Sequence, residues 1–436
     1  MRSKSILPIP VANANGGDGE KIMATIKNAR ERHNDEVTRS VSAILDDVRK
    51  RGDSALFDYT EKFDGVRLTP AKVRVSADYL NERAALISPD VRRAIRSVTR
   101  RIRRFHGEQG LVDFKMKTID GELSQVIKPL NRVGVYIPGG HTAYPSTVLM
   151  NIIPAQLAKV KEIVAVMPPK DEIDPSVAFA LTFLKITEVY RVGGAQAIGA
   201  LAYGTKTIKP VDKIVGPGNS YVATAKRLVY GSVGIDSVAG PSEVVIVADK
   251  TAPPRLVALD LLAQAEHGSG DEIAVCIVED KSTAQRIAEA LEEEVEKSPV
   301  KDTLLKLPPH AVTIFVTSSR RESMALADTI APEHLQIMTA TASEDIKLVS
   351  NAAAIFLGVN TPTVLGDYFM GTNHVLPTGG AARYASPLGV ESFQKRVLVT
   401  KASQRGIELA SVHASILARS EGFVHHAMSV EERLTT

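Results

Sequence analysis

The spacing of apolar residues predicts helices in the first part of the chain. Val37, Val41, Ile44 and Val48 recur at intervals of three or four residues, and Gly52 is a typical helix stop. A second apolar stripe consists of Val91, Ile95, Val98, Ile102 and Phe105. Arginines occupy the other faces of this second segment. Because no aromatic or base-reading pattern accompanies them, they favour a solvent-exposed helix face over a nucleic-acid surface.

From Arg132 onward, short apolar runs alternate with helix-length segments. The runs are mostly β-branched and include RVGVYIPGG, EIVAVMPP, DKIVGPGN, EVVIVADK, EIAVCIVED, VTIFVTS and AAAIFLG. Such alternation is typical of parallel sheets with helices on both faces, so the expected fold class is α/β. Residues 1–30 are polar and predict an N-terminal arm, whereas the residues after about 390 lose the strand pattern and predict a helical tail.

Composition indicates an ordinary soluble protein. The 436 residues are 44% hydrophobic and 24% charged, with a formal net charge of +3. This balance gives no general attraction to nucleic acid or membranes. The single cysteine, Cys276, lies in a predicted core strand, so it can form no intrachain disulfide and is a poor nucleophile. Because the N-terminus also has no signal-peptide core, we expect a cytoplasmic protein.

Two glycine-marked turns are candidates for a nucleotide site. GPGNSYVATAKR (216–227) and VGGAQAIGALAYGT (192–205) each enter a helix, whose N-terminal N–H groups suit an anion. Neither matches the dinucleotide fingerprint, and each alone is explained as well by close packing. Together they would line the crevice at the carboxyl ends of parallel strands, where ligands of such sheets bind. A nucleotide site and plain packing therefore stay open as alternatives.

Two short motifs carry polar side chains at the ends of apolar segments. Gln264 and His267 of LLAQAEHGSG are three residues apart on one predicted helix face, although a histidine near a helix C-terminus is also favoured by the helix dipole. Glu333 and His334 of APEHLQI are adjacent on a predicted turn. They are candidates for general acid and base, with a solvated turn as the alternative.

A long polar loop and the tail add further candidates. Residues 364–396 contain Asp367, His374 and Arg383 among glycines and prolines, and a loop of this kind inside an α/β protein is usually functional. The tail contributes Glu421 and two adjacent histidines. Nitrogen and oxygen ligands suited to Zn²⁺ are thus available from Gln264, His267, Asp367 and either His425 or His426. With no thiolates, such a site would have a catalytic character.

These motifs resemble the histidinol dehydrogenase family over nearly the whole chain from about residue 35. The resemblance rests on eight ordered blocks: VGVYIPGG, GGAQAIGALAYGT, VDKIVGPGNSYV, GIDSVAGPSEVVIVAD, LLAQAEHG, APEHLQI, GDYFMGTNHVLPT and SPLGVESFQKR. It implies oxidation of L-histidinol to L-histidine through the aldehyde, with two NAD⁺ and one zinc ion per site. In this family His334 would be the base that takes the alcohol proton, and Glu333 would activate the water that attacks the aldehyde.

The resemblance also implies which residues bind metal, substrate and cofactor. The metal ligands would be Gln264, His267, Asp367 and His426, the last chosen over His425 by its distance from the preceding Glu-Gly pair. The substrate-binding residues would be Ser242, Gln264, His267, His334, Asp367, His374, Glu421 and His426. The NAD-contacting residues would be Tyr136, Gln196 and Asn219.

At the level of domains, the resemblance implies two Rossmann-like parallel-sheet domains with an incomplete nucleotide-binding fold. We expect an N-terminal arm (1–30), a discontinuous main α/β domain (31–132 and 243–388), an inserted NAD-binding domain (133–242) and a helical dimerisation tail (389–436). Family members are homodimers whose tails reach into the partner's site. Glu421 and His426 would then serve the other subunit.

Three other functions are compatible with parts of this pattern. A relative with the same metal and Glu-His pair could oxidise a different small alcohol, such as a sulfopropanediol, because function depends on the site rather than the fold. A metal-dependent hydrolase could use Glu333 as its base without nicotinamide. A non-catalytic binding protein is a further alternative, against which the retention of Glu333, His334 and all four proposed ligands argues.

Overall fold

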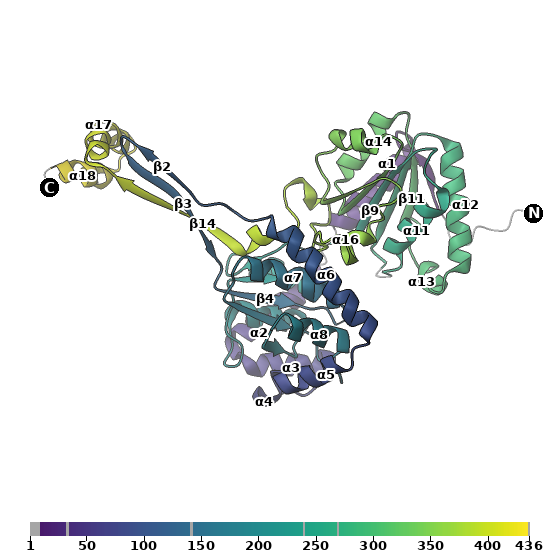
Figure 1. Cartoon of the computed structure of the whole chain (residues 1–436), viewed down its shortest axis with the longest axis horizontal. Coiled ribbons are helices and arrows are strands. Elements are labelled where there is room, and N and C mark those ends of the chain that lie inside the picture. Colours follow the sequence, from purple (N-terminus) through teal and green to yellow (C-terminus); the bar gives the residue numbers. More distant parts are fainter. Residues whose placement is uncertain (1–8, 32–34, 140–142, 239, 268–269, 435–436) are drawn as a thin grey trace, which may run out of the picture.

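The computed structural model describes residues 9–31, 35–139, 143–238, 240–267 and 270–434. The apolar runs that begin at Arg132 form strands of two parallel sheets, and helices cover both faces of each (Figure 1). A third, antiparallel sheet forms a long arm that carries two helices at its tip. The expected α/β class with parallel sheets and a helical C-terminal end is therefore confirmed.

The six-stranded sheet has the order β1-β11-β10-β9-β12-β13, and all its neighbouring strands are parallel. Its strands are β1 (Val11–Asn13), β9 (Glu243–Ala248), β10 (Ile273–Val278), β11 (Val312–Val316), β12 (His334–Met338) and β13 (Ala354–Leu357). The helices are α11 (Pro254–Ala265) and α12 (Lys281–Lys297) on one face, and α1 (Gly17–Glu31) and α14 (Arg320–Ile330) on the other. Because both faces are covered, the central strands are continuous apolar runs without polar alternation.

The described part of the N-terminal segment belongs to this sheet and is not a separate arm. Val11 of β1 lies opposite Ile314 of β11, and Ile26 of α1 is buried in the core beneath the sheet. The predicted boundary at residue 30, which separated an arm from the main domain, is therefore wrong for the described residues. A three-residue edge strand whose partner lies far along the chain leaves almost no local pattern.

The five-stranded sheet has the order β6-β5-β4-β7-β8 and is also parallel. Its strands are β4 (Arg132–Tyr136), β5 (Glu162–Val166), β6 (Glu188–Tyr190), β7 (Lys213–Val215) and β8 (Gly234–Ile235). One face carries α5 (Ala77–Ala85), α6 (Pro89–Gly107), α7 (Pro145–Leu157) and α8 (Pro175–Phe183). The other carries α2 (Asp35–Arg51), α3 (Asp53–Asp64), α9 (Gly194–Tyr203) and α10 (Ser220–Val229).

The helices of residues 35–107 therefore pack on the five-stranded sheet, and not with residues 243–388 as the sequence analysis grouped them. A Cβ placed on Gly199 of α9 would lie 3.2 Å from Leu45 and 3.3 Å from Val48, so α2 lies directly against α9. An apolar stripe shows that one helix face is buried. It does not show which sheet the face covers, and this explains the difference.

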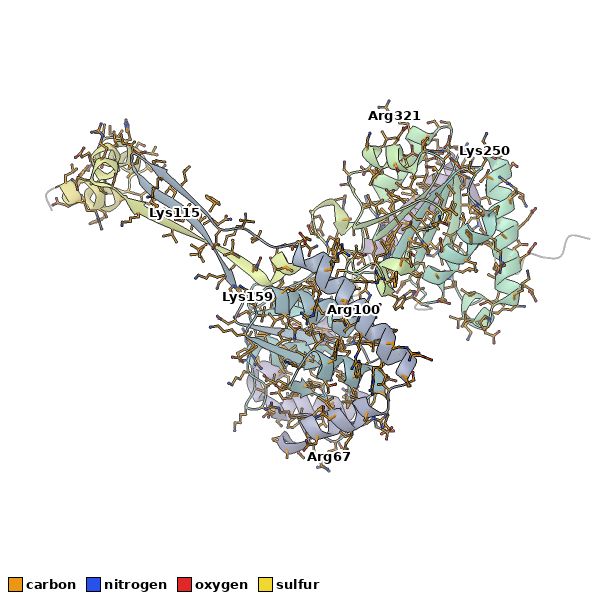
Figure 2. The ribbon with its side chains drawn as sticks, in the orientation of Figure 1. Arg67, Arg100, Lys115, Lys159, Lys250 and Arg321 are labelled. Carbon is orange, nitrogen blue, oxygen red and sulfur yellow. The ribbon has the colours of Figure 1, made fainter. Side chains whose placement is uncertain are left out.

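The arm is built from β2 (Phe114–Thr118), β3 (Gly121–Pro129) and β14 (Gln394–Ala402), with α17 (Gln404–Ser420) and α18 (Val424–Glu431) at its tip (Figure 1). The sequence pattern predicted helices alone after residue 389, but β14 pairs along its whole length with β3. The partner of β14 lies far away in the sequence, which hides the pairing. Figure 2 shows labelled basic side chains spread over the arm and both sheet domains.

The long loop that follows β13 connects the two parallel-sheet domains. Val375, Leu388 and Phe393 of this loop are buried in the core next to the five-stranded sheet, and the Asn373 side chain donates to the Met150 carbonyl oxygen at 2.8 Å. The remaining short helices are α4 (Pro70–Val73), α13 (Lys301–Leu304), α15 (Ala342–Asp345), α16 (Val364–Tyr368) and the 3-10 turns η1 (Ile346–Leu348), η2 (Ala381–Arg383), η3 (Val390–Phe393) and η4 (Glu432–Leu434). Within the described residues, no helix is both long and apolar enough to cross a membrane.

Candidate active site

Glu333 and His334 lie at the N-terminal edge of the six-stranded sheet, where β12 begins. Both side chains are nearly buried, with 8% and 10% of their surfaces exposed. The backbone of Glu243, the first residue of β9, contacts both: its N–H donates to Glu333 Oε2 at 3.0 Å, and its carbonyl oxygen lies 3.1 Å from His334 Nδ1. A carbonyl can only accept, so Nδ1 carries the proton and Nε2 of the neutral ring is an acceptor.

The surroundings of this pair shift both groups toward their uncharged forms. Burial raises the pKa of Glu333 from its ordinary 4.5 to about 8, and the charges of Glu243 and Asp367 act in the same direction. Burial lowers the pKa of His334, against the opposing influence of Asp367. His334 Nε2 is buried and has no hydrogen-bond partner among the described residues. The pair therefore presents an unprotonated ring nitrogen beside a carboxyl group that titrates near neutral pH.

Three of the predicted metal ligands lie next to this pair. Gln264 is in the last turn of α11, and His267 follows the end of that helix. His267 Nδ1 lies 3.0 Å from the Gln264 carbonyl oxygen, which leaves its Nε2 available as a ligand atom. Asp367 of α16 approaches His334 Nε2 to 3.9 Å; burial raises the pKa of Asp367, and the charges of His334 and His267 lower it.

His374 and Ser242 also lie at this edge of the sheet. Burial and, to a smaller extent, the nearby charge of His334 lower the pKa of His374 to about 4. Ser242 directly precedes β9, and its carbonyl oxygen accepts a hydrogen bond from the Ile273 N–H at 3.1 Å. The binding roles predicted for both residues stay predictions.

The fourth predicted ligand and Glu421 lie elsewhere in the same chain. His426 is in α18 and Glu421 directly follows α17, at the tip of the arm and far from α16 (Figure 1). Both side chains are exposed, and the ring of His426 contacts that of Phe423 at a centroid distance of 5.0 Å. In the part of the chain that the structure describes, no three His, Cys, Asp or Glu side chains gather closely enough to hold a metal ion by themselves.

The predicted NAD-contacting residues follow the carboxyl ends of strands in the five-stranded sheet. Tyr136 ends β4, and its hydroxyl accepts a hydrogen bond from the Gly194 N–H at 3.2 Å. Gln196 is buried in the first turn of α9, and the Asn219 side chain caps α10 by accepting from the Val222 N–H. Tyr136 thus belongs to the central strand β4. Gln196 follows β6 and Asn219 follows β7, which lie on opposite sides of β4.

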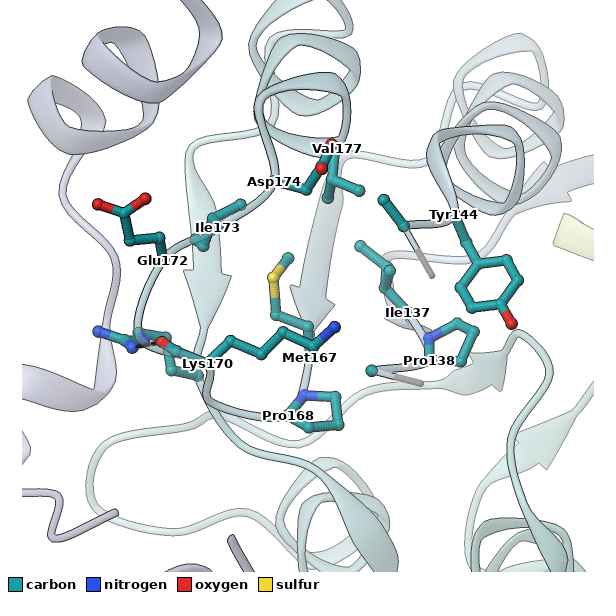
Figure 3. Close-up of a pocket in the computed structure, with 13 residues that line it drawn as sticks. Ile137, Pro138, Tyr144, Met167, Pro168, Lys170, Glu172, Ile173, Asp174 and Val177 are labelled. Carbon is teal, nitrogen blue, oxygen red and sulfur yellow. Dashed lines mark hydrogen bonds between the residues drawn. The ribbon is translucent and has the colours of Figure 1, made fainter. Parts of the chain in front are cut away.

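A hollow opens at the same edge, between the ends of β4 and β5 (Figure 3). Its apolar walls include Ile137, Pro138 and Met167, and Lys170 lies at its rim. Tyr144, just before α7, also lines it. Burial raises the pKa of Tyr368 in α16, with smaller contributions from Asp367, Tyr144 and Glu266.

Comparison with known proteins identifies the family. The histidinol dehydrogenase family model matches residues 27–434. The chain belongs to this family. A histidinol dehydrogenase of Gluconobacter oxydans is 45% identical over 94% of this chain and 96% of its own length, and one of Aquifex aeolicus is 44% identical over 92% and 93%. A crystal structure of a histidinol dehydrogenase from Elizabethkingia anophelis matches with a TM-score of 0.90 and 32% identity, covering 100% of this chain and 99% of that one.

Membership in the histidinol dehydrogenase family makes the chain an oxidoreductase, as the sequence analysis expected. Two residues next to the Glu333–His334 pair were not anticipated: Glu243 and Arg30, whose side chains form an ion pair of 2.7 Å. The sequence did hold one signal, a charged residue at the start of the otherwise apolar strand EVVIVA. Arg30 had none, because it lies in the segment that the sequence analysis sets apart as an arm.

Proposed function

We propose that this chain oxidises L-histidinol to L-histidine through L-histidinal, as the last step of histidine biosynthesis in the cytoplasm, with NAD⁺ and a zinc ion. The observation that carries the proposal is the buried Glu333–His334 pair. In this pair, Nε2 of His334 lies beside Asp367. This chemistry needs one base for the alcohol proton and one to activate a water. The close relatives named histidinol dehydrogenase support the choice of substrate.

His334 has the properties of the first base. Its Nδ1–H is held by the Glu243 carbonyl oxygen, which fixes the ring and directs Nε2 away from that strand. Because burial lowers its pKa, the ring is neutral near pH 7 and can accept a proton from the substrate hydroxyl. The same nitrogen would accept the proton of the aldehyde hydrate in the second oxidation.

Glu333 has the properties of the second base. Its Oε2 is anchored by the Glu243 N–H, and its pKa of about 8 makes the carboxylate a stronger base than an exposed glutamate. We assign it the water that adds to the bound aldehyde. The neighbouring charges of Asp367 and Glu243 raise its pKa and so strengthen the base.

The residues beside the pair fit a zinc ion. Gln264 could bind the ion only through its amide oxygen, since the amide nitrogen is a donor; that nitrogen is buried without a hydrogen-bond partner among the described residues. The site also offers the second nitrogen of His267 and the Asp367 carboxylate, a nitrogen and oxygen set typical of catalytic zinc. A bound zinc ion would hold the substrate by its nitrogen atoms and orient it.

The five-stranded sheet fits NAD. A Cβ on Gly216 would lie 2.2 Å from the Tyr136 carbonyl oxygen, so only glycine lets this turn pass so close to β4. Asn219 then begins α10, whose N-terminus faces the carboxyl edge of the sheet. NAD⁺ bound there would accept the hydride from the substrate, and Tyr136, Gln196 and Asn219 are the contacts that we propose.

The arm supports a homodimer in which each tail completes the site of the other subunit. Leu398 of β14 is 78% exposed, and Ile416 and Leu417 of α17 are 66% and 61% exposed. Exposed apolar side chains at this density are typical of a protein–protein interface. Glu421 and His426, which lie far from the site of their own chain, would be delivered by the arm to the partner.

Steady-state turnover tests the function. The zinc-loaded protein should convert L-histidinol to L-histidine and reduce two equivalents of NAD⁺, followed at the nicotinamide absorbance. Oxidation of 2,3-dihydroxypropane sulfonate in place of L-histidinol would support the alternative substrate. Substrate loss without any NAD⁺ reduction would point to a hydrolase, and no turnover of either alcohol would contradict the proposal.

A further inference from the structure

Arg30, in the last turn of α1, connects the N-terminal segment to the region of Glu333 and His334. Its Nε donates to Glu243 Oε1 at 2.7 Å, and its Nη1 donates to the Ile330 carbonyl oxygen at 2.7 Å. The Arg30 side chain is 13% exposed and that of Glu243 is fully buried. The planar guanidinium makes both contacts at once, which the point charge of a lysine does less well.

The two groups that Arg30 holds lie on either side of the catalytic pair. Glu243 supplies the N–H that binds Glu333 and the carbonyl that binds His334. Ile330 ends α14 three residues before Glu333. Arg30 therefore fixes both the strand that orients the two side chains and the turn from which they emerge.

The turn between α14 and β12 needs such support. Ala331 has φ 50° and ψ 59°, a left-handed conformation that is unfavourable for a non-glycine residue. Ala331 is also completely buried. A strained backbone of this kind persists only where its surroundings hold it. The Arg30 contact to the preceding carbonyl is one such restraint.

The charge of Arg30 is also matched to its site. Burial raises the pKa of Glu243, and the adjacent Arg30 opposes that shift. Without the guanidinium, a buried carboxylate would lose its cationic partner and would be expected to protonate or move. Either change would act on the backbone that holds Glu333 and His334.

We propose that Arg30 is a positioning residue for the catalytic pair, which it orders through the Glu243 carboxylate and the Ile330 carbonyl. The inference rests on the roles proposed above for Glu333 and His334. It also gives the N-terminal segment a part in the reaction that the sequence did not indicate. Arg30 would act through its contacts to Glu243 and Ile330.

The test compares Arg30→Met with Arg320→Met as a matched control. Arg320 lies at the opposite edge of the same sheet and contacts Asp249, Glu279 and Asp345, with its side chain 23% exposed. We expect Arg30→Met to lower kcat by about 10- to 100-fold, as for other residues that orient active-site groups. The KM for L-histidinol and the zinc content should stay near those of the parent. Arg320→Met should lower the thermal midpoint while kcat stays within about two-fold of the parent, since it removes only a distant network.

A double-mutant cycle separates positioning from general destabilisation. Glu243→Gln should lower kcat to a similar degree, and the Arg30→Met/Glu243→Gln double variant should be no slower than the worse single variant. Arg30→Lys, which retains the charge, should recover part of the rate and replaces Arg30→Met if that variant does not fold. Parent-like kcat in Arg30→Met, additive effects in the cycle, or a loss explained by missing zinc would overturn the inference. An inactive parent protein would instead contradict the proposed function.

Discussion

The buried ion pair between Lys226 and Asp236 makes a sharp prediction about the glycine turn that enters α10. Lys226 Nζ contacts Asp236 Oδ1 and donates to the Gly216 carbonyl oxygen at 3.0 Å, while Asp236 Oδ2 accepts from the Gly216 N–H at 2.7 Å. The two side chains thus hold both polar groups of one peptide residue. Their exposed fractions are only 2% and 5%. Lys226→Met removes the cation and leaves the buried carboxylate.

The expected loss of stability is large. Removing one partner of a buried ion pair costs about 3–5 kcal/mol, because the remaining charge has no compensation. For a domain of this size each kcal/mol lowers the thermal midpoint by about 2–4 °C, which predicts a fall of about 6–20 °C in differential scanning calorimetry. The loosened Gly216 turn should also raise the KM for NAD⁺ in the folded protein, with the KM for L-histidinol unchanged.

The double variant Lys226→Met/Asp236→Asn is the control for this reasoning. It removes both charges, so it should recover most of the stability that the single variant loses. An unfolding free energy of Lys226→Met within about 1 kcal/mol of the parent value would contradict the prediction. It would mean that the unpaired carboxylate costs far less than expected. A double variant as unstable as the single one would lead to the same conclusion. The ion pair would then be incidental to the turn.

The remaining predictions concern the catalytic groups and the tail. Glu333→Gln should slow the oxidation of L-histidinal far more than that of L-histidinol in single-turnover experiments; equal rates for the aldehyde in variant and parent would refute its role. Because the folded state keeps the Glu333 proton up to about pH 8, whereas the unfolded chain loses it near 4.5, the unfolding free energy of the metal-free protein should fall as pH rises between these values. That fall should be smaller in Glu333→Gln when both are measured by urea denaturation. His267→Ala should lose zinc and turnover together by metal analysis, and unchanged zinc content would exclude it as a ligand. Mixing inactive His267→Ala and His426→Ala subunits should restore activity if tails are exchanged, since one site per dimer is then intact; no recovery in mixed dimers would contradict the exchange.

The sequence predicts the sheets well because their strands are buried on both faces. Runs such as EVVIVA and IAVCIV are apolar nearly throughout, because helices cover both faces of the sheet. This pattern can be recognised within each short segment of the sequence. It also brings Glu333 and His334 to attention as two titratable residues at the start of such a run. The pairing of strands that are far apart in the sequence cannot be predicted from such local patterns. The β14 strand is mostly exposed, and its partner β3 lies far earlier in the chain.

The positions of single side chains in the site also depend on the three-dimensional structure. Gln264 and His267 were expected on one helix face, whereas α11 ends at Ala265 and His267 instead turns back to the Gln264 carbonyl. Gln264 and His267 are still close together, because a histidine just past a helix end can reach the last turn. Arg30 gave no signal, since its importance depends entirely on which backbone groups lie beside it in three dimensions.

The two parallel sheets present opposite kinds of helix end at the two edges that carry the candidate residues. At the N-terminal edge of the six-stranded sheet, α11 ends next to Gln264 and His267, and the negative end of a helix dipole favours a cation. At the carboxyl edge of the five-stranded sheet, α9 and α10 begin, and their N–H groups favour an anion. Tyr144 lines the hollow at this second edge and contributes to the raised pKa of Tyr368 in α16. The proposed metal ion and dinucleotide would therefore each meet the helix end whose partial charge suits it.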